Sequence, residues 1–371
     1  MSDPEPFYLP PRVADWLGKV VIVEEKGITA ERSLIESFAV AVEDANPLYW
    51  GGVIAPPGML SAWTRPHVWS PAGAPRQRPL ELHFRLKEAF GLPKAVVIET
   101  DAVYYEPVRP GDRVRAEQVL DQVGPMVETR LGTGRKWTIS MRYARHDGAL
   151  QGVETLRFFA YGSQTASLLE GEVDGAERRR VGGAGAAFSQ PSDQGRHHPP
   201  PGPTGRSPTQ GGRCPAGSAD YCAGTTIPAL TVEMTATRII MGAAASRDWQ
   251  RQHHDTNYAR ESGLPDIILN APSQSGWLNR YVTDWAGPGS RLGRLRFRMA
   301  KPIAAGTTVT FLGSVEAVGS RGGCRWLQVK LAIASDGQIM TDAAALLATP
   351  DSVQPWQSGP GAWDIPDWDL A

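Results

Sequence analysis

The sequence predicts an α+β protein made of two similar units, in which a curved antiparallel sheet is packed around one central helix in each unit. Two observations predict this fold. Each half of the 371-residue chain begins with segments of helical periodicity and ends with several β-rich runs. Short motifs also recur in the same order in both halves, which indicates a duplicated unit. A long helix followed by successive antiparallel strands gives such a unit.

The recurring motifs mark corresponding turns and strands of the two halves. They are PVRPGDRV (107–114) with PIAAGTTV (302–309), and a tryptophan followed ten residues later by Asp-Gly, namely Trp137 with Asp147-Gly148 and Trp326 with Asp336-Gly337. Asp-Gly between β-rich runs is a strong hairpin signal. We therefore expect each half to end in a hairpin.

The remaining elements follow from hydrophobic periodicity. In the first half we expect a helix over 31–47, a second apolar segment over 58–69, and strands over 81–88, 95–108 and 112–123. In the second half we expect helices over 235–246, 254–263 and 273–285, and strands over 294–303 and 307–318.

Composition divides the chain into four parts. The expected folded units cover 8–162 and 221–350, and between them the segment 163–220 is rich in Gly, Pro and Arg with almost no periodic apolar residues. Such a segment is expected to be a disordered linker. The acidic, Trp-rich tail at 351–371 is expected either to pack its tryptophans on the body or to be mobile.

Charge and cysteine content narrow the class of protein. A net charge of −1 argues against nucleic-acid binding, which calls for a basic excess. No apolar run is long enough to span a bilayer, and no secretory signal is visible at the start. Three cysteines without a CxxC pair favour a reducing compartment with no disulfide framework. We expect a soluble, cytoplasmic protein.

The stretch SRDWQRQHHDTNY (246–258) places two adjacent histidines behind an acid. It contains the pattern D-x-Q-x-x-H, formed by Asp248, Gln250 and His253. The first half has EDANPLY at 43–49, which carries D-x-N-P-x-Y in the corresponding place. Both segments follow the first helical segment of their half. We interpret Asp248 and His253 as functional residues, since surface capping alone does not explain this spacing.

The pattern D-x-N-P-x-H is the signature of the MaoC-like, (R)-specific enoyl-CoA hydratases, whose fold is the hotdog. The second half resembles this signature, with Gln250 in place of Asn and Arg251 in place of Pro. Residues 245–285 also resemble the C-terminal half of two-hotdog dehydratases of that family. The first half, with EDANPLYW and VIAPPGML, resembles the fatty-acid-synthase-like dehydratase domain that precedes it. The resemblance implies a double hotdog in which 221–350 is catalytic.

Hydration of an enoyl thioester needs a base for water, an acid for Cα and a donor for the carbonyl oxygen. The resemblance implies that Asp248 and His253 form the catalytic dyad and contact one water molecule. Imidazole suits this role because it titrates near neutrality. The family's carbonyl donor is a backbone N–H at the start of the central helix. Counting forward from His253 assigns it to Ala271, with Asn270 beside it.

Further residues are expected to support the dyad and to bind the CoA phosphates, which require positive charge. Gln250, His254 and Asn270 are supporting candidates. The CoA-binding candidates are Arg247, Arg251, Arg294, Arg296 and Arg298. The last three alternate with apolar residues in RLRFRMAK, so a solvated outer sheet face is an equal alternative for them.

The first half is expected to be non-catalytic. Tyr49 stands where the signature has a histidine, and a tyrosine with its ordinary pKa of about 10 is no base at neutral pH. Asp44 and Asn46 are then turn residues. The apolar residues that follow are expected to be core or to line an acyl tunnel: Trp50, Met59, Leu60 and Trp63.

The leading functional hypothesis is (R)-specific hydration of 2-enoyl-CoA thioesters or the reverse dehydration. The alternatives are a hotdog acyl-CoA thioesterase and a non-catalytic acyl-CoA-binding subunit. We expect no cofactor and no metal, because no third metal ligand accompanies Asp248 and His253. Two fused hotdogs supply the sheet pairing of a dimer, so both a monomer and a homodimer are expected.

Overall fold

The computed structural model describes residues 8–25, 27–69, 71, 78–129, 131–162, 221–351, 354–356, 363–368 and 370. These residues belong to one compact unit. The expected linker at 163–220 lies outside the described residues. In this described part of the chain, no helix combines the length and apolar character that crossing a bilayer requires.

In the part of the chain that the structure describes, the first half supplies five strands and most of the short helices. Its elements are α1 (Pro11–Ala14), β1 (Val20–Glu24), α2 (Arg32–Ala41), α3 (Pro47–Trp50), the 3-10 helix η1 (Pro57–Trp63), α4 (Glu81–Phe90), β2 (Lys94–Tyr104), β3 (Val114–Thr129), β4 (Gly132–Arg145) and β5 (Leu150–Gly162).

The second half repeats the arrangement with one longer helix. Its elements are β6 (Thr226–Met234), α5 (Ala236–Ala245), the 3-10 helix η2 (Arg251–His253), α6 (Thr256–Glu261), α7 (Ala271–Ala286), β7 (Arg291–Met299), β8 (Thr307–Arg321), β9 (Cys324–Ser335) and β10 (Gln338–Thr349).

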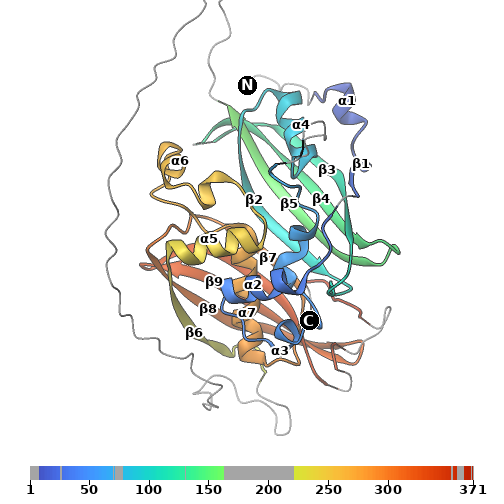
Figure 1. Ribbon diagram of the computed structural model, residues 1–371, viewed down its shortest axis with the longest axis vertical. Helices are drawn as coiled ribbons and strands as arrows, with labels where there is room; N and C mark the ends of the chain where they lie inside the picture. Colours follow the sequence, from blue (N-terminus) through green and yellow to red (C-terminus); the bar gives the residue numbers. More distant parts are fainter. Residues whose placement is uncertain are drawn as a thin grey trace, which may run out of the picture. The chain divides into compact units, whose positions relative to one another are not determined.

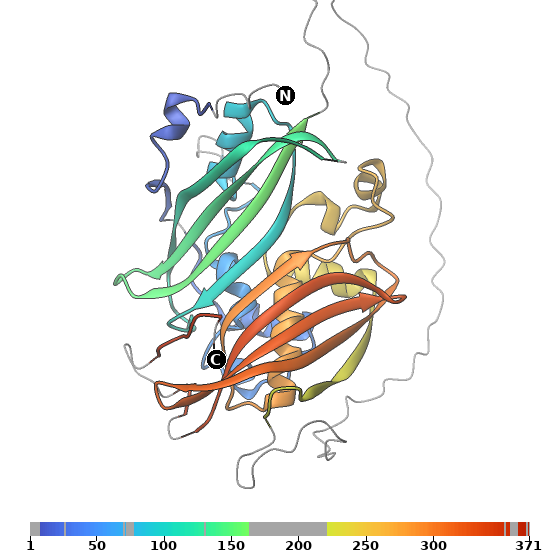
Figure 2. The same ribbon diagram turned by 180° about the vertical axis from the view of Figure 1, so that it is seen from behind.

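The ten strands of the described residues join in one antiparallel sheet with the order β1-β3-β4-β5-β2-β7-β10-β9-β8-β6. The order of the second half mirrors that of the first, as a duplication requires. The halves meet where β2 pairs with β7, from Thr100 opposite Phe297 to Val103 opposite Arg294. Figures 1 and 2 show α2, α5 and α7 gathered on one face of the sheet. The predicted α+β class is confirmed.

Helix α7 is buried along most of its length although several of its side chains are polar. Several of these groups, which need hydrogen-bond partners when buried, find them in both halves. Thr341 donates to Gln274 at 2.7 Å, and Asn279 donates to the hydroxyl of Tyr49 at 3.1 Å. The central helix therefore ties the second half to the first.

Glycines allow the close packing of α7 against the first half. A Cβ atom built on Gly276 would lie 2.8 Å from the ring of Phe38 and 3.0 Å from Val42. On η1, a Cβ on Gly58 would lie 3.0 Å from the backbone N of Gly276 and from the carbonyl of Pro272. Segments α2 and η1 thus pack directly on α7. This packing restricts the position of the residues that follow η1.

One expected element is wrong and two observed strands were not predicted. Residues 81–88 form helix α4 rather than a strand, because Leu82 and Leu86 lie on one buried face at helical spacing. The apolar residues of ELHFRLKE fit both the two-residue period of a strand and the 3.6-residue period of a helix. Gly91, in the left-handed conformation, ends the helix. Strands β1 and β6 were not expected at the starts of the halves. Both are edge strands, whose sequence pattern is weak.

Other expectations are confirmed. Both Asp-Gly hairpins form, between β4 and β5 and between β9 and β10. In the second hairpin Asp336 and Gly337 both have positive φ, as a two-residue type I′ turn requires. Helices α5, α6 and α7 lie where the periodicity predicts them.

The described part of the tail packs on the outer face of the second half's sheet. Trp363, Ile365, Trp368 and Leu370 contact a small cluster that includes Trp326. The indole of Trp363 also donates to the carbonyl of Tyr104 at 2.8 Å. Of the two alternatives for the tail, packing of its tryptophans on the body is therefore confirmed for these residues.

One expectation about the cysteines is wrong. Cys222 is disulfide-bonded, whereas the sparse set of cysteines predicts no disulfide framework. An odd number of cysteines still allows one pair, so the count alone does not decide the state of each thiol.

The packing of α7 yields a stability prediction. We expect Gly276→Val to destabilise the protein by about 1–3 kcal/mol, because the new side chain overlaps the buried ring of Phe38 and the backbone cannot withdraw. The midpoint of urea unfolding measures the change. Gly124→Val is the control, since its Cβ would have 3.4 Å to the nearest heavy atom. Equal midpoints for the two variants would contradict the close-packing argument.

Candidate active site

Asp248 lies in a tight turn directly after α5. Its backbone N–H donates to the carbonyl of Ala243 at 2.8 Å, and Arg247 before it has a φ of 55°. The first half has the same turn after α2, where Asp44 N–H donates to Ala39 at 2.8 Å. The two aspartates therefore occupy equivalent places in the duplicated fold.

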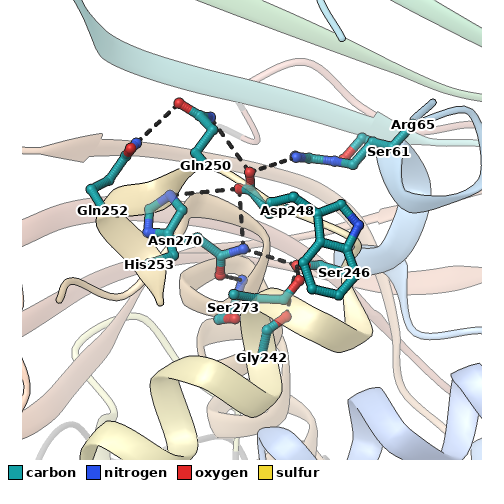
Figure 3. Close-up of polar contacts among 12 residues, drawn as sticks. Ser61, Arg65, Gly242, Ser246, Asp248, Gln250, Gln252, His253, Asn270 and Ser273 are labelled. Atoms are coloured by element: carbon teal, nitrogen blue, oxygen red, sulfur yellow. Dashed lines mark hydrogen bonds and ion pairs between the residues drawn. The ribbon is translucent and has the colours of Figure 1, made fainter. Parts of the chain in front are cut away.

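His253 ends η2 and is only 5% exposed. Its Nδ1 is 2.8 Å from the carbonyl oxygen of Ile268. Because a carbonyl only accepts, Nδ1 carries the proton and Nε2 of the neutral ring is an acceptor. This Nε2 faces Oδ2 of Asp248 at 3.7 Å, so the structure brings the two expected dyad residues together (Figure 3).

Asn270 caps the N-terminus of α7 and also holds the carboxylate. Its Oδ1 accepts from Ser273 N–H at 3.1 Å, and its Nδ2 donates to Oδ2 of Asp248 at 3.2 Å and to Ser246 Oγ at 2.8 Å. Ala271 is the first residue of the helix. Its N–H is used by no hydrogen bond to another described residue, and such N–H groups are the donors that an anionic oxygen finds at a helix start.

Arg65 of the first half is a site residue that sequence reasoning missed. Its Nη1 lies 2.8 Å from Oδ1 of Asp248, and the two side chains are 17% and 5% exposed. Figure 3 shows it approaching the carboxylate from the side opposite His253. No spacing links Arg65 to residue 248, since 183 positions separate them in the sequence. The available signal was physical: a buried carboxylate needs a cationic partner.

The surroundings set the charge state of the dyad. Burial alone would raise the pKa of Asp248, but Arg65, His253 and Asn270 outweigh it and hold that pKa below its ordinary value. Burial lowers the pKa of His253, and the neighbouring carboxylate only partly opposes this. At neutral pH the pair is therefore a carboxylate beside a neutral imidazole.

The supporting candidates differ in their contacts with the dyad. Gln250 lies 3.4 Å from Oδ1 of Asp248 and accepts from Gln252 at 3.0 Å. His254 does not contact the dyad: its Nε2 lies 3.2 Å from the carbonyl of Trp249 at the surface. Asp255 caps α6 through Tyr258 N–H, as a capping residue should.

The five candidate arginines are not gathered at one place. Arg247 is buried and donates to the carbonyl of Ala62 at 3.0 Å, whereas Arg251 is exposed and pairs with Asp255 at 2.7 Å. The three arginines of β7 project from the face opposite the buried Leu295 and Phe297.

The β7 arginines have partners of their own on that outer face. Arg294 makes two bonds of 2.8 Å to Asp101, and both Arg294 and Arg296 lie over the ring of Trp368. Arg298 lines a separate cleft on the same face together with Lys136 and Arg157. The structure does not bring these arginines to Asp248.

The corresponding place in the first half has no imidazole. Asn46 caps α3 and donates its N–H to Asp44 at 2.9 Å, while Tyr49 is buried and its hydroxyl accepts from Asn279. Burial raises the pKa of Tyr49 well above its ordinary value. Tyr49 and Asn46 therefore make structural contacts, and among the described residues no imidazole stands beside Asp44.

The apolar residues near this turn are mostly core. Met59, Leu60 and Trp63 are buried, whereas Trp50 is 42% exposed and donates from its indole to the carbonyl of Asp44 at 2.8 Å. Leu60 lines a narrow cavity together with Tyr104 and others.

Comparison with known proteins relates the second half to one family. Residues 223–333 match the family model described as a MaoC like domain. The 3-oxo-4,17-pregnadiene-20-carboxyl-CoA hydratase beta subunit of Mycobacterium tuberculosis is 41% identical over 95 residues, which cover 26% of this chain and 74% of that protein. A probable enoyl-CoA hydratase alpha subunit of Thermomonospora curvata is 22% identical over 162 residues, 40% of this chain and 51% of that protein.

Solved structures show the fold. A MaoC-like dehydratase superposes with a TM-score of 0.61 at 16% identity, over 91% of this chain and 99% of its own. A conserved hypothetical protein of Mycobacterium tuberculosis with a double hotdog fold gives a TM-score of 0.54 at 14% identity, over 90% of this chain and 97% of its own. The expected double hotdog is thereby confirmed.

The contacts of His253 predict its titration. At neutral pH we expect a neutral ring with the proton on Nδ1, and protonation only below the ordinary value of 6.5, because the buried imidazolium is poorly solvated. Two-dimensional ¹H–¹⁵N NMR of the histidine rings measures both, with His253→Asn identifying the signal. Asp248→Asn should lower the pKa of His253 further, since it removes the neighbouring anion. A ring that is protonated at neutral pH would disprove this charge assignment.

Proposed function

The chain belongs to the MaoC-like dehydratase family, and from this premise we propose that it hydrates 2-enoyl-CoA thioesters to (R)-3-hydroxyacyl-CoA or catalyses the reverse dehydration. The observation that carries the proposal is the pair formed by Asp248 Oδ2 and His253 Nε2 at 3.7 Å. Both atoms are acceptors, so they cannot bond each other. A water molecule has two donor hydrogens and suits both at once.

The proposed reaction moves one proton through His253. In hydration, Nε2 takes a proton from water while the water oxygen bonds to Cβ, and the alkene electron pair moves onto the thioester oxygen. The imidazolium then returns a proton to Cα as the carbonyl re-forms, so that H and OH have been added and His253 is neutral again. A neutral imidazole is the form that the first step needs.

The thioester oxygen needs a donor while it is negatively charged. We assign this role to the N–H of Ala271, at the positive end of the buried helix α7. One such donor is typically worth about 3–4 kcal/mol in the transition state. Asn270 supports it, because its side chain joins the start of the helix to Asp248.

We propose that the segment 8–162 is the non-catalytic, acyl-side half and that 221–350 is the catalytic half. The absence of an imidazole partner for Asp44 among the described residues supports this division. Because β2 and β7 already pair within the chain, one chain is sufficient to build one site.

For the CoA phosphates we propose Arg251 as the first of the five arginines to test. Its side chain is 60% exposed and lies two residues from His253 in sequence. A surface pair such as that with Asp255 contributes little, so exchange of partners costs little. Arg247, already bound to the first half, and the β7 arginines on the outer face rank behind it.

The choice of substrates to test follows from the relatives. Crotonyl-CoA is the first substrate to test, because its short acyl chain needs little space in the acyl pocket. The Mycobacterium tuberculosis beta subunit is named for a steroid 20-carboxyl-CoA, and we propose bulky acyl-CoA thioesters of this kind as the second class to test.

One assay separates the proposed hydratase from its alternatives. Enoyl absorbance and free thiol are followed together after addition of crotonyl-CoA. Hydration removes the absorbance without releasing thiol. Release of thiol would instead indicate a thioesterase, and binding without either change a non-catalytic subunit.

Substitution of the dyad gives the decisive prediction. We expect Asp248→Asn and His253→Ala each to lower the hydration rate by about 10²–10⁴-fold, as loss of a general base does, with unchanged far-UV circular dichroism. Asp44→Asn is the matched control, because Asp44 occupies the equivalent turn without a histidine, and it should keep wild-type activity. Full activity of either dyad variant would rule out the proposed mechanism.

A further inference from the structure

Asp248 is held by groups on two sides, and the two sides belong to different halves of the protein. Oδ2 faces His253 and Asn270 of the second half. Oδ1 is bound by Arg65 of the first half at 2.8 Å. The carboxylate therefore has one oxygen toward the expected site of chemistry and one anchored across the boundary between the halves (Figure 3).

The chain around Arg65 is fixed by several contacts. It follows η1, which packs on α7 through Gly58. The carbonyl of Ala62 accepts from the guanidinium of Arg247, the residue immediately before Asp248. Segments 62–65 and 247–248 are thus tied by two guanidinium contacts that run in opposite directions, one given by each half. Such a double tie restricts both the position and the orientation of the carboxylate.

The first half provides an internal comparison. Asp44 occupies the same turn as Asp248 and is likewise buried, at 2% and 3% exposure. Asp44 has one backbone donor, from Asn46, and its Oδ2 has no hydrogen-bond partner among the described residues. Burial raises the pKa of Asp44 to about 6, whereas that of Asp248 is lowered. Asp248 differs from Asp44 in having Arg65, His253 and Asn270 as partners, and of these Arg65 lowers its pKa most.

Other titratable groups face Arg65 from the first half. Glu24 of β1 and Glu154 of β5 lie near its charge, and Tyr143 donates to Glu154 at 2.8 Å. Burial raises the pKa of both acids, that of Glu24 to about 7. At neutral pH these carboxyls are therefore less ionised than Asp248, which leaves Asp248 as the main anionic partner of Arg65.

We propose that Arg65 is a positioning residue, supplied by the non-catalytic half, which fixes Asp248 as an anion whose second oxygen, Oδ2, orients the reacting water beside His253. This inference rests on the proposed hydratase function. It assigns proton transfer to His253 and orientation to Asp248, and it gives the first half a direct part in the chemistry of the second.

The test compares Arg65→Gln, Arg65→Lys and Arg238→Gln. Arg238 is the matched control: it also joins the halves, by binding Glu43 at 3.0 Å, but it does not contact the dyad. We expect Arg65→Gln to lower kcat for crotonyl-CoA about a hundredfold with little change in KM, because a misplaced catalytic group costs about that much. Arg65→Lys should recover part of the loss, and Arg238→Gln should keep wild-type kcat.

The pH profile distinguishes positioning from general destabilisation. Without the cation, protonation of Asp248 and of His253 becomes easier. We expect the acid limb of kcat/KM in Arg65→Gln to move to higher pH, and the NMR titration of His253 to move in the same direction. Glu24→Gln, made in the wild type and in Arg65→Gln, removes the contribution of Glu24 to the pH profile. An Arg65→Gln enzyme with wild-type kcat and an unmoved acid limb would overturn the inference.

The NMR titration also separates this inference from the proposed function. If the wild-type protein hydrates no enoyl-CoA, the proposed function fails and the His253 titration alone decides the role of Arg65. If the pKa of His253 in folded Arg65→Gln is unchanged, the electrostatic role of Arg65 is overturned. If that pKa is raised, the role is supported. Thermal unfolding of all variants verifies that the folded state is compared.

Discussion

The burial of a polar helix between the two halves is the constraint on which the site depends. Most buried polar side chains of α7 have a partner, because an unpaired buried group costs about 1–3 kcal/mol, although Ser273 Oγ has none among the described residues. Asn279 finds the hydroxyl of Tyr49, and Ser275 lies 3.4 Å from that of Tyr104. Both tyrosines belong to the first half, which is therefore part of the interior of the second.

Duplication followed by divergence accounts for the difference between the two turns. The backbone hydrogen bond after α2 and the one after α5 are alike, but the side chains beyond Asp44 and Asp248 are not. In the first half the position of the signature histidine is taken by Tyr49, which now supports α7. In the second half the aspartate retains an imidazole and gains the guanidinium of Arg65. The first half thus contributes contacts both to the interior of the second half and to Asp248.

Much of this arrangement was readable in the sequence, and the exceptions have physical causes. Local signals predicted the hairpins and the helices of the second half. A strand over 81–88 was wrong because ELHFRLKE satisfies both periods, and only its packing selects the helix. Asp248, His253 and Asn270 were candidates because of their spacing and the family resemblance, and the structure brings them together. Arg65 could not be predicted in this way, since its contact with Asp248 depends on how η1 packs against α7.

The packed tail changes how the end of the chain should be regarded. Trp363 lies over the guanidinium of Arg291 at 3.8 Å, and Ile365 packs near Gly293 and Trp326. The tail covers an outer sheet face that would otherwise expose aromatic side chains to other molecules. A chain shortened before residue 363 would expose that surface, and the first defect to look for in such a fragment is self-association rather than loss of chemistry.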